Sequence, residues 1–195
     1  LVHIKKVEIF GFKSFGFTNT TIQFEPGLVS ISGPNGSGKS NILDAIIFAM
    51  GENKPKVMRV DKLRSLIHDI EGNRRGPKMA RTSVHFDNSD RKIPIDSDAV
   101  EITREIDANG ENTYYLNKKK TNRSHILDLL DMANAGLGQL NVVQQGTVTR
   151  ISEFTSEEKR KTIEDLIGLS YFDDKKIESI KQLDEADRRL EIALA

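Results

Sequence analysis

Alternation of apolar and polar positions predicts two strands near the start of the chain, over residues 2–10 and 20–24. A third strand is predicted over residues 28–32, where Val29 and Ile31 alternate with serines. Three strands in quick succession before a helix favour a mixed α+β sheet over a simple doubly wound one.

The period of the pattern then changes from two to about 3.6. Apolar residues fall at helical spacing after residue 40: Ile42, Leu43, Ile46, Ile47 and Met50. Gly51 is expected to end this helix, because glycine readily takes the left-handed conformation of a C-terminal cap.

Further apolar runs predict strands over residues 80–86, 100–106 and 113–116. The Asn109-Gly110 pair between the last two is a strong signal for a tight hairpin. We expect these strands to form an antiparallel meander beside the core that the first elements build. An amphipathic helix is predicted next, over Arg123–Met132.

The remainder of the chain predicts a short strand over residues 140–144 and two helices. A capping box at residues 155–158 begins a helix that Gly168 ends. The final run, residues 169–195, is highly charged with a narrow apolar seam and reaches the last residue without a cap. It is either a surface helix of its own domain or the start of a coiled coil.

The glycine-rich segment between the third strand and the first helix matches the phosphate-binding loop pattern G-x-x-x-x-G-K-[ST] over residues 33–40. In such a loop, backbone N–H groups and the lysine surround a nucleotide's phosphates while the hydroxyl reaches Mg²⁺. The strand–loop–helix context is the one that the motif requires, so nucleotide binding is the main hypothesis. The alternative is a glycine-rich turn that binds no ligand.

The amino-acid composition limits which binding partners and chemical sites the chain can have. The 195 residues include 29 basic and 29 acidic side chains, so any nucleic-acid binding must come from local patches. The chain has no cysteine, which excludes disulfides, cysteine nucleophiles and thiolate metal sites. No apolar run reaches the length of a transmembrane helix, so no membrane partner is expected.

Two basic clusters are candidates for contacts with DNA phosphates. The first, near a hairpin tip, contains Lys118, Lys119, Lys120 and Arg123. The second, in a loop, contains Arg74, Arg75 and Lys78. Such contacts would be sequence-independent and sensitive to salt. The alternative is that these charges only solvate the surface.

Several short motifs occur together and in order along the chain. They are G-F-K-S-F at residues 11–15, the phosphate loop at 33–40, M-R at 58–59, Y-L-N at 115–117, N-V-V-Q-Q-G at 141–146, I-E-D-L-I-G at 163–168 and Y-F-D-D-K-K at 171–176. The whole chain resembles the N-terminal half of the ATPase head of a prokaryotic SMC (structural maintenance of chromosomes) protein, in the family that includes condensin and cohesin.

This resemblance implies an ABC-type P-loop NTPase head in which the N- and C-terminal parts of one long chain fold together. Residues 1–168 would form the N-terminal lobe, and residues 169–195 the neck helix that begins a coiled-coil arm. The implied catalytic residues are Lys39 on the β- and γ-phosphates, the R-loop residue Arg59, and the Q-loop residue Gln145. ATP and Mg²⁺ are the implied cofactors, with Ser40 and Gln145 at the metal.

The nucleotide-binding residues that the resemblance implies are Lys13, Ser14, Gly33, Asn35, Gly36, Ser37, Gly38, Lys39, Ser40, Asn41, Arg59 and Gln145. Three alternatives stay open. Arg59 could be an ordinary solvated loop arginine, Gln144 could be the functional glutamine, and Lys13 and Ser14 could be turn residues only.

Two parts of an ABC-type active site are missing from the sequence. ABC chemistry uses an apolar strand ending in Asp-Glu, and the run at residues 126–131 has an internal acidic residue and a helical period. No Ser-Gly-Gly signature loop occurs either. We therefore expect the complete head to hydrolyse ATP and this chain alone to be inactive.

The implied partners are the C-terminal half of the same head, a second head engaged through ATP, a kleisin subunit at the neck, and non-specific DNA. The implied function is to gate DNA in chromosome condensation and segregation, in the cytoplasm and on the nucleoid. Two alternatives remain: a coiled-coil ABC ATPase of double-strand-break repair, and a module in which nucleotide only stabilises DNA or subunit binding without turnover.

Overall fold

The computed structural model describes residues 2–68 and 76–137, with short stretches at 155–157, 160, 180 and 183. The chain divides into two units, Leu1–Leu137 and Gly138–Ala195, and the helices and strands named below lie in the first. The strand at 140–144, the boundary at 168–169 and nearly all of the terminal helices fall outside the described residues.

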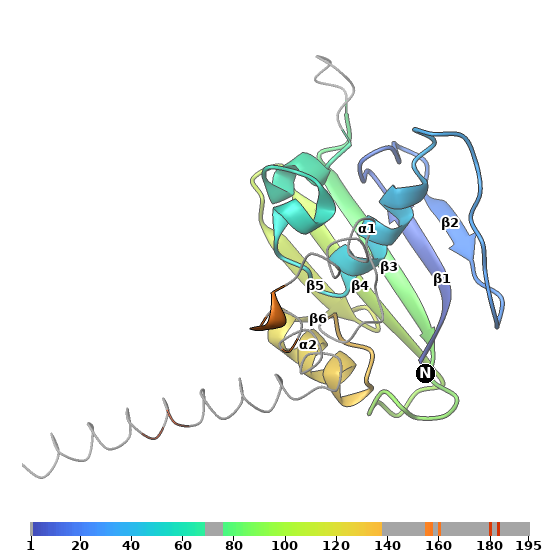
Figure 1. Cartoon of the computed structure of the whole chain (residues 1–195), viewed down its shortest axis with the longest axis vertical. Coiled ribbons are helices and arrows are strands. Elements are labelled where there is room, and N and C mark those ends of the chain that lie inside the picture. The colour runs from blue at the N-terminus through green and yellow to red at the C-terminus, as the bar shows by residue number, and fades with distance from the viewer. Residues whose placement is uncertain are drawn as a thin grey trace, which may run out of the picture. The chain divides into compact units, whose positions relative to one another are not determined.

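The first unit is built on a six-stranded sheet in which every neighbouring pair is antiparallel (Figure 1). Across the sheet the strands are β2 (Thr20–Gln23), β1 (His3–Phe10), β3 (Met79–Asp87), β4 (Ala99–Asp107), β5 (Asn112–Leu116) and β6 (Lys119–Thr121). The α+β class and the antiparallel meander predicted from the sequence are confirmed.

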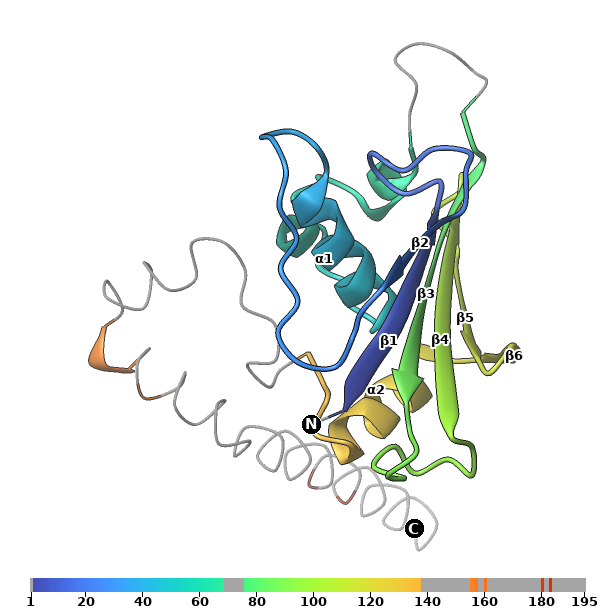
Figure 2. The same cartoon turned by 90° about the vertical axis from the view of Figure 1, so that its right-hand side faces the viewer.

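Alternation along the strands gives the sheet one apolar and one polar face. Val84 and Phe86 on β3 and Ile102 and Ile106 on β4 are at most 2% exposed. Their neighbours in sequence are polar, as expected for an antiparallel sheet with one solvated side. Helix α1 (Lys39–Ala49) lies on one side of the sheet (Figure 2), and it contacts β3 and β4.

The end of α1 follows the prediction. The N–H groups of Gly51 and Glu52 donate to the carbonyls of Phe48 and Ile47, at 3.1 and 3.0 Å. Gly51 has φ of 103°, so this is a Schellman-type cap that glycine accommodates without strain. Two short 3₁₀ turns follow, η1 (Pro55–Met58) and η2 (Leu63–Leu66).

Helix α2 spans Arg123–Met132, the range predicted. Its N-cap is Asn122, whose Oδ1 accepts from the His125 N–H at 2.8 Å. The helix packs at the C-terminal end of α1, since the Leu127 side chain lies beside Gly51. The rejection of residues 126–131 as an acidic catalytic strand is thus confirmed, because they are helical.

The sequence did not predict β6. The turn that precedes it places both Asn117 and Lys118 at positive φ, 47° and 67°, which is the geometry of a two-residue hairpin turn. The three residues Lys119–Thr121 then pair with β5. A strand this short carries too little periodicity to be recognised by pattern.

The predicted strand over residues 28–32 is wrong for the described structure. These residues form no strand, and Leu28 is fully exposed while Val29 and Ile31 are each 43% exposed. A strand requires a neighbour for its backbone N–H and C=O groups. Within residues 2–68 and 76–137 none is offered to this segment, because β2 pairs only with β1.

None of the helices in the described part of the chain is long and apolar enough to cross a membrane.

Candidate functional site

The phosphate-binding loop closes around its own lysine. Lys39 Nζ donates to the carbonyl oxygens of Gly33 and Pro34, at 2.8 and 2.7 Å. Gly36 and Gly38 have φ of 82° and 90°, which an L side chain would adopt only under strain. These glycines therefore permit the compact turn that carries the chain into α1.

The N-terminus of α1 has the features of an anion site. Gly38 is its N-cap and supplies no side-chain hydrogen bond, and no acidic residue stands in the first turn. The first N–H groups of a helix carry partial positive charge and lack partners within the helix. The residues present therefore fit a nucleotide's phosphates, with Lys39 and the exposed Ser40 hydroxyl at the same end.

The loop after β1 comes to the same place. Asn41 Nδ2 donates to Ser14 Oγ at 2.9 Å. A Cβ added at Gly38 would lie 2.6 Å from that hydroxyl oxygen, and the φ of 90° at this residue also favours glycine. The structure thus brings Ser14 beside the phosphate-binding loop, from a segment 24 residues earlier in the chain.

Lys13 and Arg59 converge on the middle of α1, at a residue that the sequence analysis missed. Lys13 Nζ and Arg59 Nη2 both donate to Asp44 Oδ2, each at 2.5 Å. Asp44 lies on α1 and is 2% exposed. The available signal was an acidic residue inside the otherwise apolar run Ile42-Leu43-Asp44-Ala45.

The remaining predicted residues divide in two. Asn35 and Ser37 are exposed in the loop, and Ser37 N donates to the Pro34 carbonyl at 3.3 Å. Gln145, Arg74 and Arg75 lie outside the described residues, so their predicted roles stay predictions. Within the described part of the chain, no three acidic or histidine side chains gather to hold a metal.

A buried arginine anchors the other end of α1. Arg104 on β4 is fully buried, and its guanidinium donates to the carbonyls of Phe48 and Glu52, at 3.0 and 2.6 Å, and to Asn53 Oδ1 at 2.7 Å. Burial lowers the pKa of Arg104 to about 10, which leaves it charged at neutral pH. A cation at the negative end of a helix is favourable, so this contact fixes α1 against the sheet.

The basic hairpin is exposed at its tip, with one exception. Lys118, Lys119 and Lys120 are all exposed. Arg123, predicted to join them, instead donates from Nε to the Gly51 carbonyl at 2.7 Å. Its guanidinium is therefore partly engaged in holding α2 to the end of α1.

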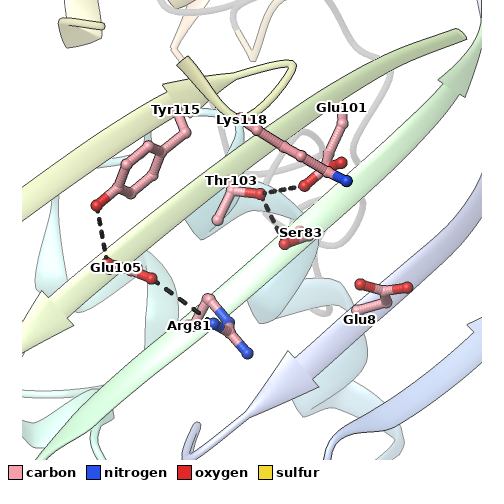
Figure 3. A pocket seen from close by; sticks show the side chains of 8 residues that line it. All are labelled: Glu8, Arg81, Ser83, Glu101, Thr103, Glu105, Tyr115 and Lys118. Atoms are coloured by element: carbon pink, nitrogen blue, oxygen red, sulfur yellow. Dashed lines mark hydrogen bonds and ion pairs between the residues drawn. The ribbon is translucent and has the colours of Figure 1, made fainter. Parts of the chain in front are cut away.

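The polar face of the sheet holds a shallow depression of about 340 Å³. Figure 3 shows its lining side chains: Glu8, Arg81, Ser83, Glu101, Thr103, Glu105, Tyr115 and Lys118. A hydrogen bond from Lys6 lowers the pKa of Glu8, with a smaller contribution from the neighbouring His85, although partial burial opposes this. The lining of this depression carries three carboxylates and two cations, Arg81 and Lys118.

The chain is similar to known proteins in both sequence and fold. The RecF/RecN/SMC N terminal domain matches residues 3–142. The chain is 38% identical over 188 residues to the Chromosome partition protein Smc of Pyrococcus furiosus, covering 96% of this chain and 16% of that protein. The chain therefore spans about one sixth of the length of this curated relative.

Two solved structures are also similar. One comes from work on ATP-driven dimerization and DNA-stimulated activation of SMC ATPases, with 40% identity and a TM-score of 0.80, covering 84% of this chain and 99% of that one. The other is a Smc head domain with an extended coiled coil, bound to the C-terminal domain of ScpA, from Pyrococcus furiosus, with 38% identity, a TM-score of 0.80 and coverage of 97% and 48%. The chain belongs to the SMC family, as an N-terminal domain of its ATPase head.

Proposed function

We propose that this chain binds ATP and Mg²⁺ as one wall of a composite ATPase site, which the C-terminal half of the same protein completes. The observation that carries this proposal is the closed loop around Lys39 at the uncapped N-terminus of α1. In that site Lys39 and the N–H groups of the loop bind phosphate oxygens, and Ser40 supplies a hydroxyl to Mg²⁺. Bound Mg²⁺ supplies charge neutralisation for phosphoryl transfer.

The Asp-Glu pair that ABC-type hydrolysis uses has to come from another segment of the complete protein. Asp44, the buried acidic residue on α1, is occupied by two cations and does not face the loop as a free carboxylate. Three apolar residues of one segment are exposed: Leu28, Val29 and Ile31. Their exposure supports the presence of another segment that covers them in the complete head, because apolar surface patches often mark contact sites. We infer that the C-terminal half covers this segment and pairs with it as a strand.

The wider assembly follows from the relatives. One similar structure concerns ATP-driven dimerization, and another contains ScpA. We propose that two heads engage through ATP, that a kleisin subunit binds at the neck, and that this cycle gates DNA during chromosome partition in the cytoplasm. Lys118, Lys119 and Lys120 are the proposed DNA contacts, as exposed cations at a hairpin tip.

The decisive experiment reconstitutes the head. The C-terminal half is co-expressed with this chain, and ATP hydrolysis is measured with and without DNA. We expect a stable complex with turnover, and no turnover by this chain alone. Failure of the halves to associate would overturn the proposal, whereas a complex that binds ATP without hydrolysing it would support the nucleotide-stabilised binding module instead. Partnership with a nuclease would support the double-strand-break-repair type.

A further inference from the structure

The carboxylate of Asp44 is the meeting point of two loops that are distant in sequence. It lies 31 residues from Lys13 and 15 residues from Arg59, and both side chains donate to the same oxygen, Oδ2, at 2.5 Å. The Asp44 side chain is 3% exposed. A buried carboxylate in this setting requires cationic partners, because burying an unpaired charge is costly.

The two cations differ in how firmly they are held. Lys13 Nζ has a second acceptor, the Met58 carbonyl at 2.5 Å, and its side chain is 12% exposed. The Arg59 side chain is 48% exposed. A guanidinium has five N–H donors, so Arg59 retains donors for another anion after it has bonded to Asp44. Arg59 is therefore the partner that can reach a ligand, while Lys13 is enclosed.

The backbone of both loops is also held in place. Lys13 and Arg59 have positive φ, 50° and 57°, a conformation uncommon for residues with side chains. Lys13 N donates to the Leu66 carbonyl at 2.7 Å, and His68 Nδ1 lies 2.5 Å from the Lys13 carbonyl oxygen. Uncommon backbone conformations persist where the surrounding contacts determine them, and they gather at ligand sites.

Asp44 stands close to the phosphate-binding loop along α1. It follows Ser40 by four residues, and residues at this spacing lie on the same face of a helix. Lys39 is the first residue of α1, and Lys13 and Arg59 both bond to Asp44, which lies five residues further along the same helix. The single carboxylate of Asp44 thus has two cationic partners, and its bonds to them fix where both positive charges lie.

We propose that Asp44 is a positioning residue for the nucleotide site: its carboxylate holds Lys13 and Arg59 against α1 so that Arg59 is placed to donate to the phosphates of a bound nucleotide. This inference rests on the proposed function and assigns a role to a residue outside the phosphate-binding motif. Asp44 itself touches no phosphate in this role.

A double-mutant cycle in the full-length protein tests the proposal. The dissociation constant for ATP is measured for wild type, Arg59→Ala, Asp44→Asn and the double variant. We expect Arg59→Ala to weaken binding about tenfold in the wild-type background and less than threefold in the Asp44→Asn background, because an unheld Arg59 contributes little. If Arg59→Ala weakens ATP binding in the Asp44→Asn background as much as in the wild-type background, or more, Asp44 does not position Arg59. The cycle is insensitive to the general effect of removing one negative charge, since that effect is common to both Asp44→Asn proteins.

Two further variants keep the result interpretable. Asp44→Asn together with Lys13→Gln removes both enclosed charges and leaves neither unpaired, so Arg59→Ala is measured in this background if Asp44→Asn alone fails to fold. Glu105→Gln is the matched control: its carboxylate faces Arg81 at 3.9 Å on the polar side of the sheet. We expect Arg59→Ala to weaken ATP binding as much in the Glu105→Gln background as in the wild type. If Glu105→Gln reduced the effect of Arg59→Ala as much as Asp44→Asn does, the proposal would be overturned.

The proposed function and this inference fail in different ways. If Lys39→Ala leaves ATP affinity unchanged, the phosphate-binding loop is not the nucleotide site and both are overturned. If Lys39→Ala abolishes binding but Arg59→Ala has no effect in the wild-type background, only the inference is overturned. The readout in each case is binding of ATP, without need of turnover.

Discussion

The guanidinium of Arg104 lies 4.1 Å from the centre of the Phe48 ring and also donates to the Phe48 carbonyl at 3.0 Å. The same guanidinium lies 4.9 Å from the Tyr114 ring centre, so it contacts two aromatic side chains. Burial of the cation strengthens its attraction to the rings. One residue of the antiparallel sheet thus holds both the side chain and the backbone at the end of the phosphate-loop helix.

We predict that Arg104→Met costs about 3 kcal/mol in free energy of unfolding, because carbonyls at the end of α1 lose their buried donor. Urea unfolding of the reconstituted head measures this cost. Arg81→Met is the matched control: Arg81 is half-exposed and its ion pair with Glu105 spans 3.9 Å, so we expect a change below about 0.5 kcal/mol. Similar losses for both variants would contradict the anchoring role.

Lys39→Ala should abolish nucleotide binding even when the C-terminal half is present. The lysine ammonium provides the charge inside the loop, where it now bonds to the Gly33 and Pro34 carbonyls. Binding of a fluorescent ATP analogue measures this effect. Lys54→Ala, which removes a charge from an exposed loop position, should leave affinity within about twofold. If Lys39→Ala left the affinity for nucleotide unchanged, this loop would not be the nucleotide site.

Replacing Leu28 and Ile31 with serine should weaken association of this chain with the C-terminal half. Burying a leucine or isoleucine side chain contributes about 1.5 to 3 kcal/mol, so the double variant should weaken binding by at least tenfold. Titration calorimetry of the two halves gives the constant. Since both residues are exposed in the isolated chain, its circular dichroism spectrum should not change. Met132→Ser, which alters an exposed apolar residue of α2, is the control and should change binding less than threefold.

Reversing the charge of Lys118, Lys119 and Lys120 should weaken DNA binding by the complete protein and flatten its salt dependence. Each phosphate contact contributes about 0.9 to the slope of log affinity against log salt concentration. Arg123→Ala should behave differently: because Arg123 bonds to Gly51, we expect lower stability of the α1–α2 contact and a smaller change in the salt slope. If the triple charge reversal left DNA binding unchanged, these lysines would serve only to keep the surface hydrated.

Local pattern was sufficient for much of this domain. Residue spacing predicted the glycine-rich turn, the helix after it, the β3–β5 meander and α2, because each depends on interactions within a few residues or between adjacent strands. The Schellman cap at Gly51 and the Asn122 cap are likewise local features of the sequence. The family resemblance rested on the same motifs and is confirmed by the matched domain.

Other features were decided by contacts that spacing does not reveal. Residues 28–32 have the apolar–polar alternation of a strand, but they form no strand in the described structure. A strand forms only where a neighbouring strand pairs with its backbone N–H and C=O groups. The convergence of Lys13 and Arg59 on Asp44 joins segments 31 and 15 residues apart. The burial of Arg104 depends on Phe48, Asn53 and Tyr114 meeting around it. The sequence by itself determined the glycine-rich turn and the helix that follows it, because both depend on residues close together in the chain. The tertiary structure decided that Lys13 and Arg59 meet at Asp44 on that helix, because this contact joins segments distant in sequence.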